Sequence, residues 1–239
     1  MYKFLNNDFR RSFFFTVSAF LIFLCGCGGN RGSDQPLEKI KVSLKNAPDY
    51  SIILEDMKQE GNFIPGYFHK YRVIQGDQQN KTGWMKVSEK NYRLNESFLG
   101  MTLVAKKDGE AISGAAPPGY QYVGDQRYGR WQNDHRGGTF WEFYGKYALF
   151  SALLGGIHRP IYRSNYDFYK QSQRRNVPYF GRNNEYGTNG SFTKKNRPDF
   201  YSRYSKREQM KKTSFKDKVT KRVGRTRTGY RSRAGGFGK

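Results

Sequence analysis

The basic residues of this 239-residue chain are concentrated near its C-terminus, and this distribution limits where a folded core can form. Residues 151–239 contain 23 Lys or Arg against 5 Asp or Glu, a net charge of +18, whereas residues 28–150 contain 17 against 14, a net charge of +3. A segment of high net charge buries too little apolar surface to offset the entropy lost on ordering. The nearly neutral segment is therefore predicted to hold the core, and the basic extension to meet an anionic partner or surface.

Residues 37–156 are predicted to form an α+β body. This body is small, rich in antiparallel β-strands, and contains one hydrophobic helix. The alternation in residues 38–44 places Ile40, Val42 and Leu44 on one face, as in a half-buried strand. Further strands are predicted between turn-forming Gly, Asn and Asp residues, at 50–57, 67–74, 84–87 and 99–105. Short strands at this spacing favour an antiparallel sheet.

An aromatic block follows these strands. Residues 116–131 combine glycines with aromatic rings and are predicted to form a structured loop that packs onto the body. From Thr139 the apolar residues recur at helical spacing as far as Leu154, so a hydrophobic helix is predicted there, with Glu142 and Lys146 as an ion pair.

Two interpretations of this helix are open. It either lies across the sheet as a core helix, or it contacts the membrane interface or a partner protein through its aromatic face. The residues predicted to make such a contact are Trp131, Phe140, Trp141 and Tyr144.

The N-terminus has the three-part layout of a signal peptide: basic residues, an apolar run at 12–24 and then small residues. The run is shorter than the roughly 20 residues that a membrane-spanning helix needs. Cys25 and Cys27 follow it directly, while His69, His135 and His158 are scattered singly. This spacing does not favour a zinc site or a redox pair.

The stretch Leu24-Cys25-Gly26-Cys27 resembles the bacterial lipobox, in which a Leu and a small residue precede a lipid-bearing Cys. The resemblance implies a lipoprotein signal peptide at 1–26, acylation of Cys27, and a flexible tether at 27–36. No aspartate follows Cys27, so in a Gram-negative cell the resemblance favours the outer membrane. The alternative is an ordinary secretory signal, or an uncleaved anchor, with two incidental cysteines.

The sequence PPGYQYVGDQRYGRW, followed by FWEFYGKYALF, resembles a family of uncharacterised bacterial proteins with a similar glycine and aromatic block. The resemblance implies a bacterial origin. It implies no activity.

The basic extension is predicted to be largely irregular or disordered, with an aromatic and basic arm at 157–205 and a tail at 206–239 that includes a possible short helix. The tail is expected to contact anionic envelope polymers or lipid headgroups, or else to be a solvated segment. The export signal argues against nucleic acid as its partner. The basic residues concerned are Lys211, Lys212, Lys216, Lys218, Lys221, Arg222, Arg225, Arg227, Arg231 and Arg233.

The sequence contains no nucleophile elbow, phosphate-binding glycine motif or dinucleotide fingerprint. Asp125, Asp134 and Glu142, with His135, are the acid and base candidates in the aromatic block, and Asp134-His135 is more typical of a polar turn. We therefore expect a non-catalytic binding or structural component of the cell envelope, without cofactor or metal. The alternatives are a lipid-anchored hydrolase and an accessory subunit of an integral membrane protein.

Overall fold

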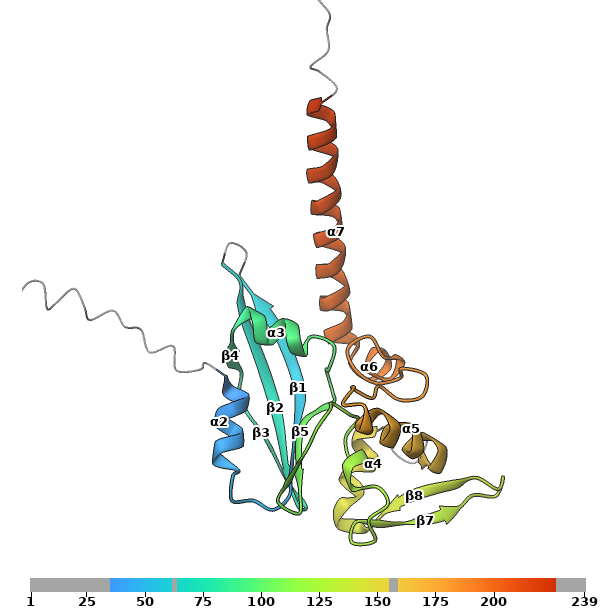
Figure 1. Cartoon of the computed structure of the whole chain (residues 1–239). Helices are drawn as coiled ribbons and strands as arrows, with labels where there is room; N and C mark the ends of the chain where they lie inside the picture. The colour runs from blue at the N-terminus through green and yellow to red at the C-terminus, as the bar shows by residue number, and fades with distance from the viewer. Residues whose placement is uncertain (1–34, 62–63, 155–158, 227–239) are drawn as a thin grey trace, which may run out of the picture. The chain divides into compact units, whose positions relative to one another are not determined.

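The computed structural model describes residues 35–61, 64–154 and 159–226, with side chains described as far as residue 223. These residues form an α+β fold, as predicted, and its strands belong to two antiparallel sheets (Figure 1). The predicted signal peptide and most of the tether lie outside the described residues.

The larger sheet has the strand order β3-β2-β1-β5-β6, and β4 also pairs with β2. Its long central pair runs in antiparallel register from Ser51 opposite Ile74 to Glu60 opposite Gly66. The four strands predicted after residue 50 are confirmed, although β5 begins three residues late. The bounds are β1 Tyr50–Glu60, β2 Gly66–Gln75, β3 Gln78–Lys81, β4 Met85–Val87, β5 Thr102–Lys107 and β6 Glu110–Ile112.

The strand predicted at residues 38–44 is wrong, because this segment forms helix α2 (Pro36–Ser43). A helix brings apolar residues three and four positions apart to one face, as with Leu37, Ile40 and Leu44. All three belong to or pack against the hydrophobic cluster of the larger sheet. Val42, which the strand prediction placed on the same face, is 68% exposed. The apolar residues of this segment fit the period of a strand and that of a helix, and packing beside β4 selects the helix (Figure 1).

The smaller sheet contains β7 (Gly129–Asn133), β8 (Thr139–Phe143) and β9 (Ile161–Tyr162). The helix predicted from Thr139 is therefore wrong in its first half, and only α4 (Ala148–Leu154) is α-helical, after the short 3-10 helix η3 (Gly145–Tyr147). Along β8, Trp141 and Phe143 are buried while the residue between them is exposed, which is the alternation of a strand.

The predicted ion pair of this segment is also absent from the described contacts. Glu142 instead accepts a hydrogen bond from Arg130 Nε at 2.8 Å across the β7–β8 hairpin. The Lys146 ammonium lies 5.1 Å from the centre of the Tyr147 ring.

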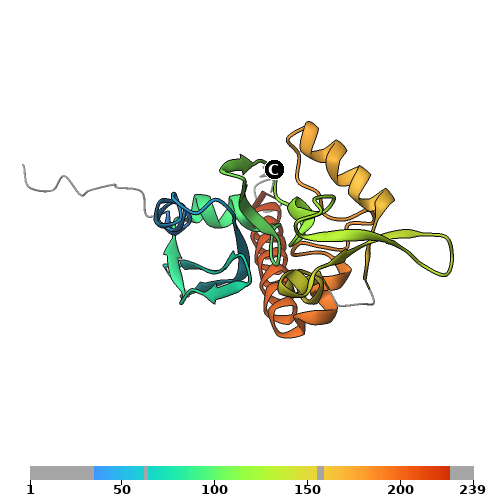
Figure 2. The same cartoon turned by 90° about the horizontal axis from the view of Figure 1, so that it is seen from below.

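The extension predicted to be largely irregular is helical over much of its described length. The arm contains α5 (Arg163–Arg174) and α6 (Ser191–Asn196), and α7 (Pro198–Thr226) crosses the predicted boundary between arm and tail. The arm is ordered because its rings belong to the core: Tyr169 and Tyr179 both pack around Tyr120. Figures 1 and 2 show α5 beside the β7–β8 hairpin.

The aromatic loop packs onto the body as predicted. Tyr120 and Tyr122, in the 3-10 helix η2 (Tyr120–Tyr122), are each 3% exposed. Gly119, just before them, has φ +84°, and an added Cβ would lie 2.7 Å from the Cβ of Phe150. Glycine is therefore required for the loop to approach α4 this closely.

Candidate functional site: the exposed part of helix α7

Helix α7 is fixed to the rest of the structure through its first turns. Phe200 is buried and stacks on Tyr204, with ring centroids 5.8 Å apart. Arg207 Nη2 donates a hydrogen bond to the carbonyl oxygen of Gln59, at the end of β1, at 2.7 Å. These contacts order the beginning of the helix, so the costly first turn is already formed when the later residues join it.

Beyond Glu208 every described side chain of α7, from residue 209 to residue 223, is exposed. The helix carries ten Lys or Arg and three Asp or Glu, which gives a net charge of +7. The residues are mostly good helix formers, and Lys211 donates to Glu208 at 2.6 Å one turn away. The possible short helix of the tail is present as part of this longer helix, whereas the disorder predicted for the tail is wrong for residues 206–226.

Most of the predicted tail residues lie on this exposed part. Arg225 is in the last turn of the helix, and its side chain is outside the described part. Arg227, Arg231 and Arg233 lie outside the described residues altogether. The exposed basic side chains are those of Lys211, Lys212, Lys216, Lys218, Lys221 and Arg222.

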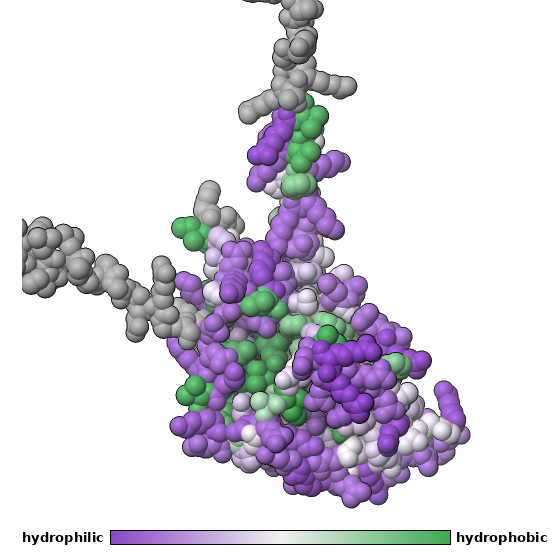
Figure 3. Space-filling view, viewed as in Figure 1, coloured by the Kyte–Doolittle hydropathy of each residue, from purple (hydrophilic) through white to green (hydrophobic). Residues whose placement is uncertain are grey.

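An apolar stripe runs along the same part of α7. Phe215, Val219 and Val223 are 70%, 43% and 60% exposed, and they follow one another at four-residue spacing. Because successive residues are about 100° apart around a helix, the three side chains share one face, and Met210 lies on the opposite face. Figure 3 shows apolar and polar side chains next to each other along the helix.

Lysines border this stripe on both sides. By the same rotation, Lys216 lies at one edge of the stripe, and Lys211 and Lys218 lie beyond the other edge. Lys212 lies in line with the stripe, about one turn before Phe215. The basic residues were predicted from the sequence but the stripe was not, because the short helix considered at the start of the tail was not expected to continue to Val223. The four-residue spacing of Phe215, Val219 and Val223 is the signal that could have found it.

The four aromatic residues predicted to dock a partner do not form an exposed surface. Trp141 is only 4% exposed, and its ring contacts Trp131 at 5.1 Å between centroids. Trp131 and Phe140 are half-buried, the former beneath Arg163 at 4.8 Å. Tyr144 is 41% exposed. Since strand β8 turns Trp141 inward, the docking face expected of a helix is not present.

The three acidic candidates are each held by local partners, and His135 is exposed in the β7–β8 turn. Hydrogen bonds from Arg127 lower the pKa of Asp125, which also pairs with Lys107 at 2.8 Å. The pKa of Asp134 is lowered by backbone hydrogen bonds from Gly138 and Arg136, so this carboxylate closes the β7–β8 turn, as the polar-turn interpretation predicts.

Glu142 also has a lowered pKa, because Arg130 and Gln132 donate hydrogen bonds to it. A carboxylate that stays ionised in this way is a poor proton donor at neutral pH. In the described structure, none of these groups lines the cavities considered next.

A recess of about 170 Å³ lies beside β9, with Arg159, Tyr162, Arg182, Glu185 and Tyr186 in its wall. Hydrolysis of a glycoside requires two carboxylates, and this wall supplies one. That carboxylate accepts hydrogen bonds from the backbone and side chain of Asn183. The recess therefore does not have the donor set of a glycosidase.

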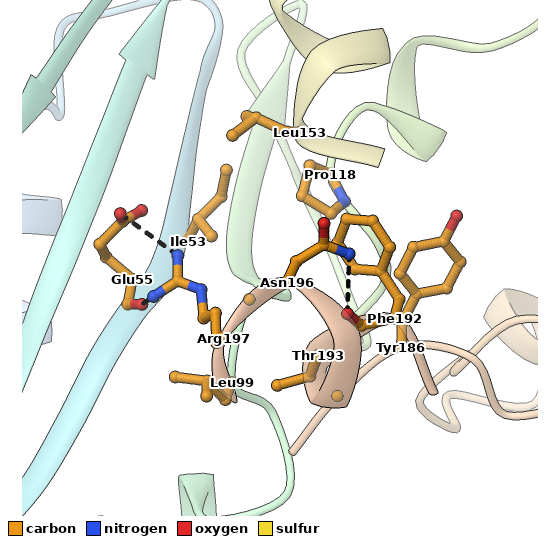
Figure 4. A pocket seen from close by; sticks show the side chains of 12 residues that line it. Ile53, Glu55, Leu99, Pro118, Leu153, Tyr186, Phe192, Thr193, Asn196 and Arg197 are labelled. Carbon is orange, nitrogen blue, oxygen red and sulfur yellow. Dashed lines mark hydrogen bonds and ion pairs between the residues drawn. The ribbon is translucent and has the colours of Figure 1, made fainter. Parts of the chain in front are cut away.

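A smaller cavity of about 50 Å³ lies between β1, α4 and α6 (Figure 4). Arg197 reaches across it to Glu55, with Nη2 3.2 Å from Oε1 and with Nη1 donating to the Glu55 carbonyl oxygen. A volume of this size admits a water molecule or two. We interpret the cavity and its ion pair as structural.

In the described part of the chain, no helix is long and apolar enough to cross a membrane, and no three His, Cys, Asp or Glu side chains are grouped to hold a metal ion. The lipobox residues Leu24, Cys25, Gly26 and Cys27 lie outside the described residues.

No protein-family model, no curated protein and no solved structure matches the chain. The resemblance of the aromatic block to uncharacterised bacterial proteins therefore stays a prediction.

Proposed function

We propose that this protein is a lipid-anchored, non-catalytic component of the bacterial cell envelope that binds anionic surfaces through α7. Cys27 carries the lipid, and in a Gram-negative cell the outer membrane is the favoured location. The exposed part of α7, with its six described basic side chains, is the observation that supports binding most directly. Its ligands are anionic envelope polymers or lipid headgroups.

The charge on α7 suits this role because it lies on exposed side chains. Near an anionic surface each Lys or Arg adds about 1 kcal/mol of attraction, which salt screens within roughly 8–10 Å. A rigid helix also holds its charges in fixed rows, so several can contact one surface together. Binding of this kind needs no enclosed pocket.

The test compares two triple variants with the same loss of charge. Lys212→Gln, Lys216→Gln and Lys221→Gln remove three charges from α7, whereas Lys45→Gln, Lys86→Gln and Lys90→Gln remove three exposed charges from the body. The probes are phosphatidylglycerol vesicles and dextran sulfate, assayed by co-sedimentation and fluorescence titration. We expect the α7 variant to bind at least about tenfold more weakly and the body variant to bind within about twofold of wild type.

Binding that falls equally in both variants would mean that net charge alone matters, and would contradict a role for α7. Wild-type protein that binds neither probe at low salt would reject the proposed function.

A further inference from the structure

We propose that α7 lies in the headgroup region of an anionic bilayer, with Phe215, Val219 and Val223 inserted toward the acyl chains and the bordering lysines on lipid phosphates. This inference rests on the proposed function and selects one of its two ligand classes, the lipid surface. It goes further in assigning the contact to an apolar stripe as well as to charge.

The geometry of the stripe is that of an interfacial helix. Phe215 and Val223 are eight residues apart, so the stripe is about 12 Å long at 1.5 Å per residue. Its three side chains are exposed despite being apolar, and lysines border both edges. A helix with this arrangement binds parallel to a membrane, with its apolar face in the acyl boundary and its cations at the headgroups. Lysine side chains are long enough to reach the phosphates from the sides of the stripe.

Charge complementarity selects a bilayer over a second copy of the chain. Two α7 helices, each of net charge +7, would repel one another if their stripes met. The stripe is also narrow, because three side chains offer far less than the roughly 800 Å² per partner that stable protein interfaces bury. A soluble anionic polymer would satisfy the lysines, but it would leave Phe215 in water. An anionic bilayer accommodates both the lysines, at its phosphates, and the apolar stripe, at its acyl chains.

The experiment places a polarity-sensitive NBD fluorophore on either face of α7. It uses the full chain with Cys25→Ser and Cys27→Ser, so that a single new cysteine is labelled and acylation does not contribute. The label is attached through Val219→Cys on the stripe or, as the matched control, through Met210→Cys on the opposite face. The probes are vesicles of phosphatidylcholine, with or without 30% phosphatidylglycerol.

We expect the label at position 219 to shift to the blue and to brighten at least about twofold on the anionic vesicles, with little change at position 210 or on neutral vesicles. A second pair of variants measures affinity. Phe215→Ser with Val219→Ser should weaken vesicle binding about tenfold or more, and Met210→Ser should not. Far-ultraviolet circular dichroism checks that α7 stays helical in each variant.

Equal responses at positions 219 and 210, or unchanged affinity in the Phe215 and Val219 double variant, would overturn insertion. If the lysine variants still lost binding, the proposed function would survive with charge as its sole basis. A response at position 219 that grows with protein concentration in the absence of vesicles would show that a second copy covers the stripe, and would likewise overturn this inference.

Discussion

Replacing Glu55 by Gln is expected to lower the free energy of unfolding by about 3 kcal/mol or more, since buried ion pairs become costly when one partner is removed. The Glu55 side chain is 10% exposed and accepts hydrogen bonds from Arg72 Nε at 2.7 Å and Arg72 Nη2 at 2.8 Å. Arg197 and Lys81 approach the same carboxylate, each at 3.2 Å. The substitution leaves three cations without their shared anion.

The pKa of Glu55 reflects both its burial and the cations around it. Burial raises it, but the hydrogen bonds from Arg72 and Lys81 and the charges of Arg197 and Arg72 outweigh burial and lower the pKa to about 2. Because the folded-state pKa is below the ordinary value of 4.5, this contribution to stability is present above pH 4.5 and is lost as the pH falls toward 2. The interaction joins β1, β2 and the residue that precedes α7.

Urea unfolding followed by circular dichroism at neutral pH measures the effect. Glu142→Gln is the matched control, because this carboxylate also pairs with an arginine but its side chain is 46% exposed. Exposed pairs contribute about 0–1 kcal/mol. Equal, small losses in the two variants would show that the Glu55 cluster does not stabilise the fold in the way its burial implies.

Acidification from pH 6.5 to pH 4 is expected to cost about 3 kcal/mol of stability through His69 alone. The ring of His69 is fully buried and stacks on Tyr92 with centroids 5.5 Å apart. Nδ1 shares a hydrogen bond with Tyr71 Oη at 3.0 Å, while Nε2 has no hydrogen-bond partner among the described residues. Burial lowers the pKa of His69 from 6.5 to about 4.

The direction of this pH dependence follows from the protonation of His69 in the unfolded and the folded chain. Below pH 6.5 the unfolded chain takes up a proton on His69, but the folded chain resists protonation until about pH 4. Protons therefore bind preferentially to the unfolded chain, and stability falls across this range. Above pH 6.5 both states are neutral at this residue and the contribution is constant.

Urea unfolding at intervals between pH 7.5 and pH 4.5 checks this expectation, with His69→Phe to remove the titrating group and His69→Gln as a second, polar replacement. His135→Gln is the control, because His135 is exposed in the β7–β8 turn. We expect the slope to flatten in the His69 variants and to persist in the control. A wild-type slope that survives in both His69 variants would assign the acid sensitivity to other groups.

The sequence predicted the central sheet well because its strands combine alternation with clear turn residues. It failed at residues 38–44, whose apolar residues suit both a strand and a helix, and at Thr139–Phe143, where dense aromatic residues hid the alternation. In both segments the local pattern allowed a strand or a helix, and packing against the rest of the protein determined which of the two formed. The ion pair between Glu55 and Arg197 spans 142 residues, and nothing local to either residue indicates it.

The candidate site was predicted in part. The net charge identified its lysines, because charge is a property of composition. Their arrangement around Phe215 and Val219 depends on a helix that begins at Pro198, outside the segment taken as the tail. Trp141 shows the opposite error: an aromatic residue expected to dock a partner is instead buried in the core.

Lipid attachment at Cys27 is tested most directly by intact mass and membrane fractionation of the chain expressed in a bacterial host. Wild type and the control Cys25→Ser should each give a membrane-bound chain that begins at acylated Cys27, whereas Cys27→Ser should lose both the lipid mass and the membrane location. A soluble, unprocessed wild-type chain that begins at Met1 would contradict the account. In that case a redox or metal-binding role for Cys25 and Cys27 would be favoured again, and nucleic acid would become the leading candidate ligand of the basic extension.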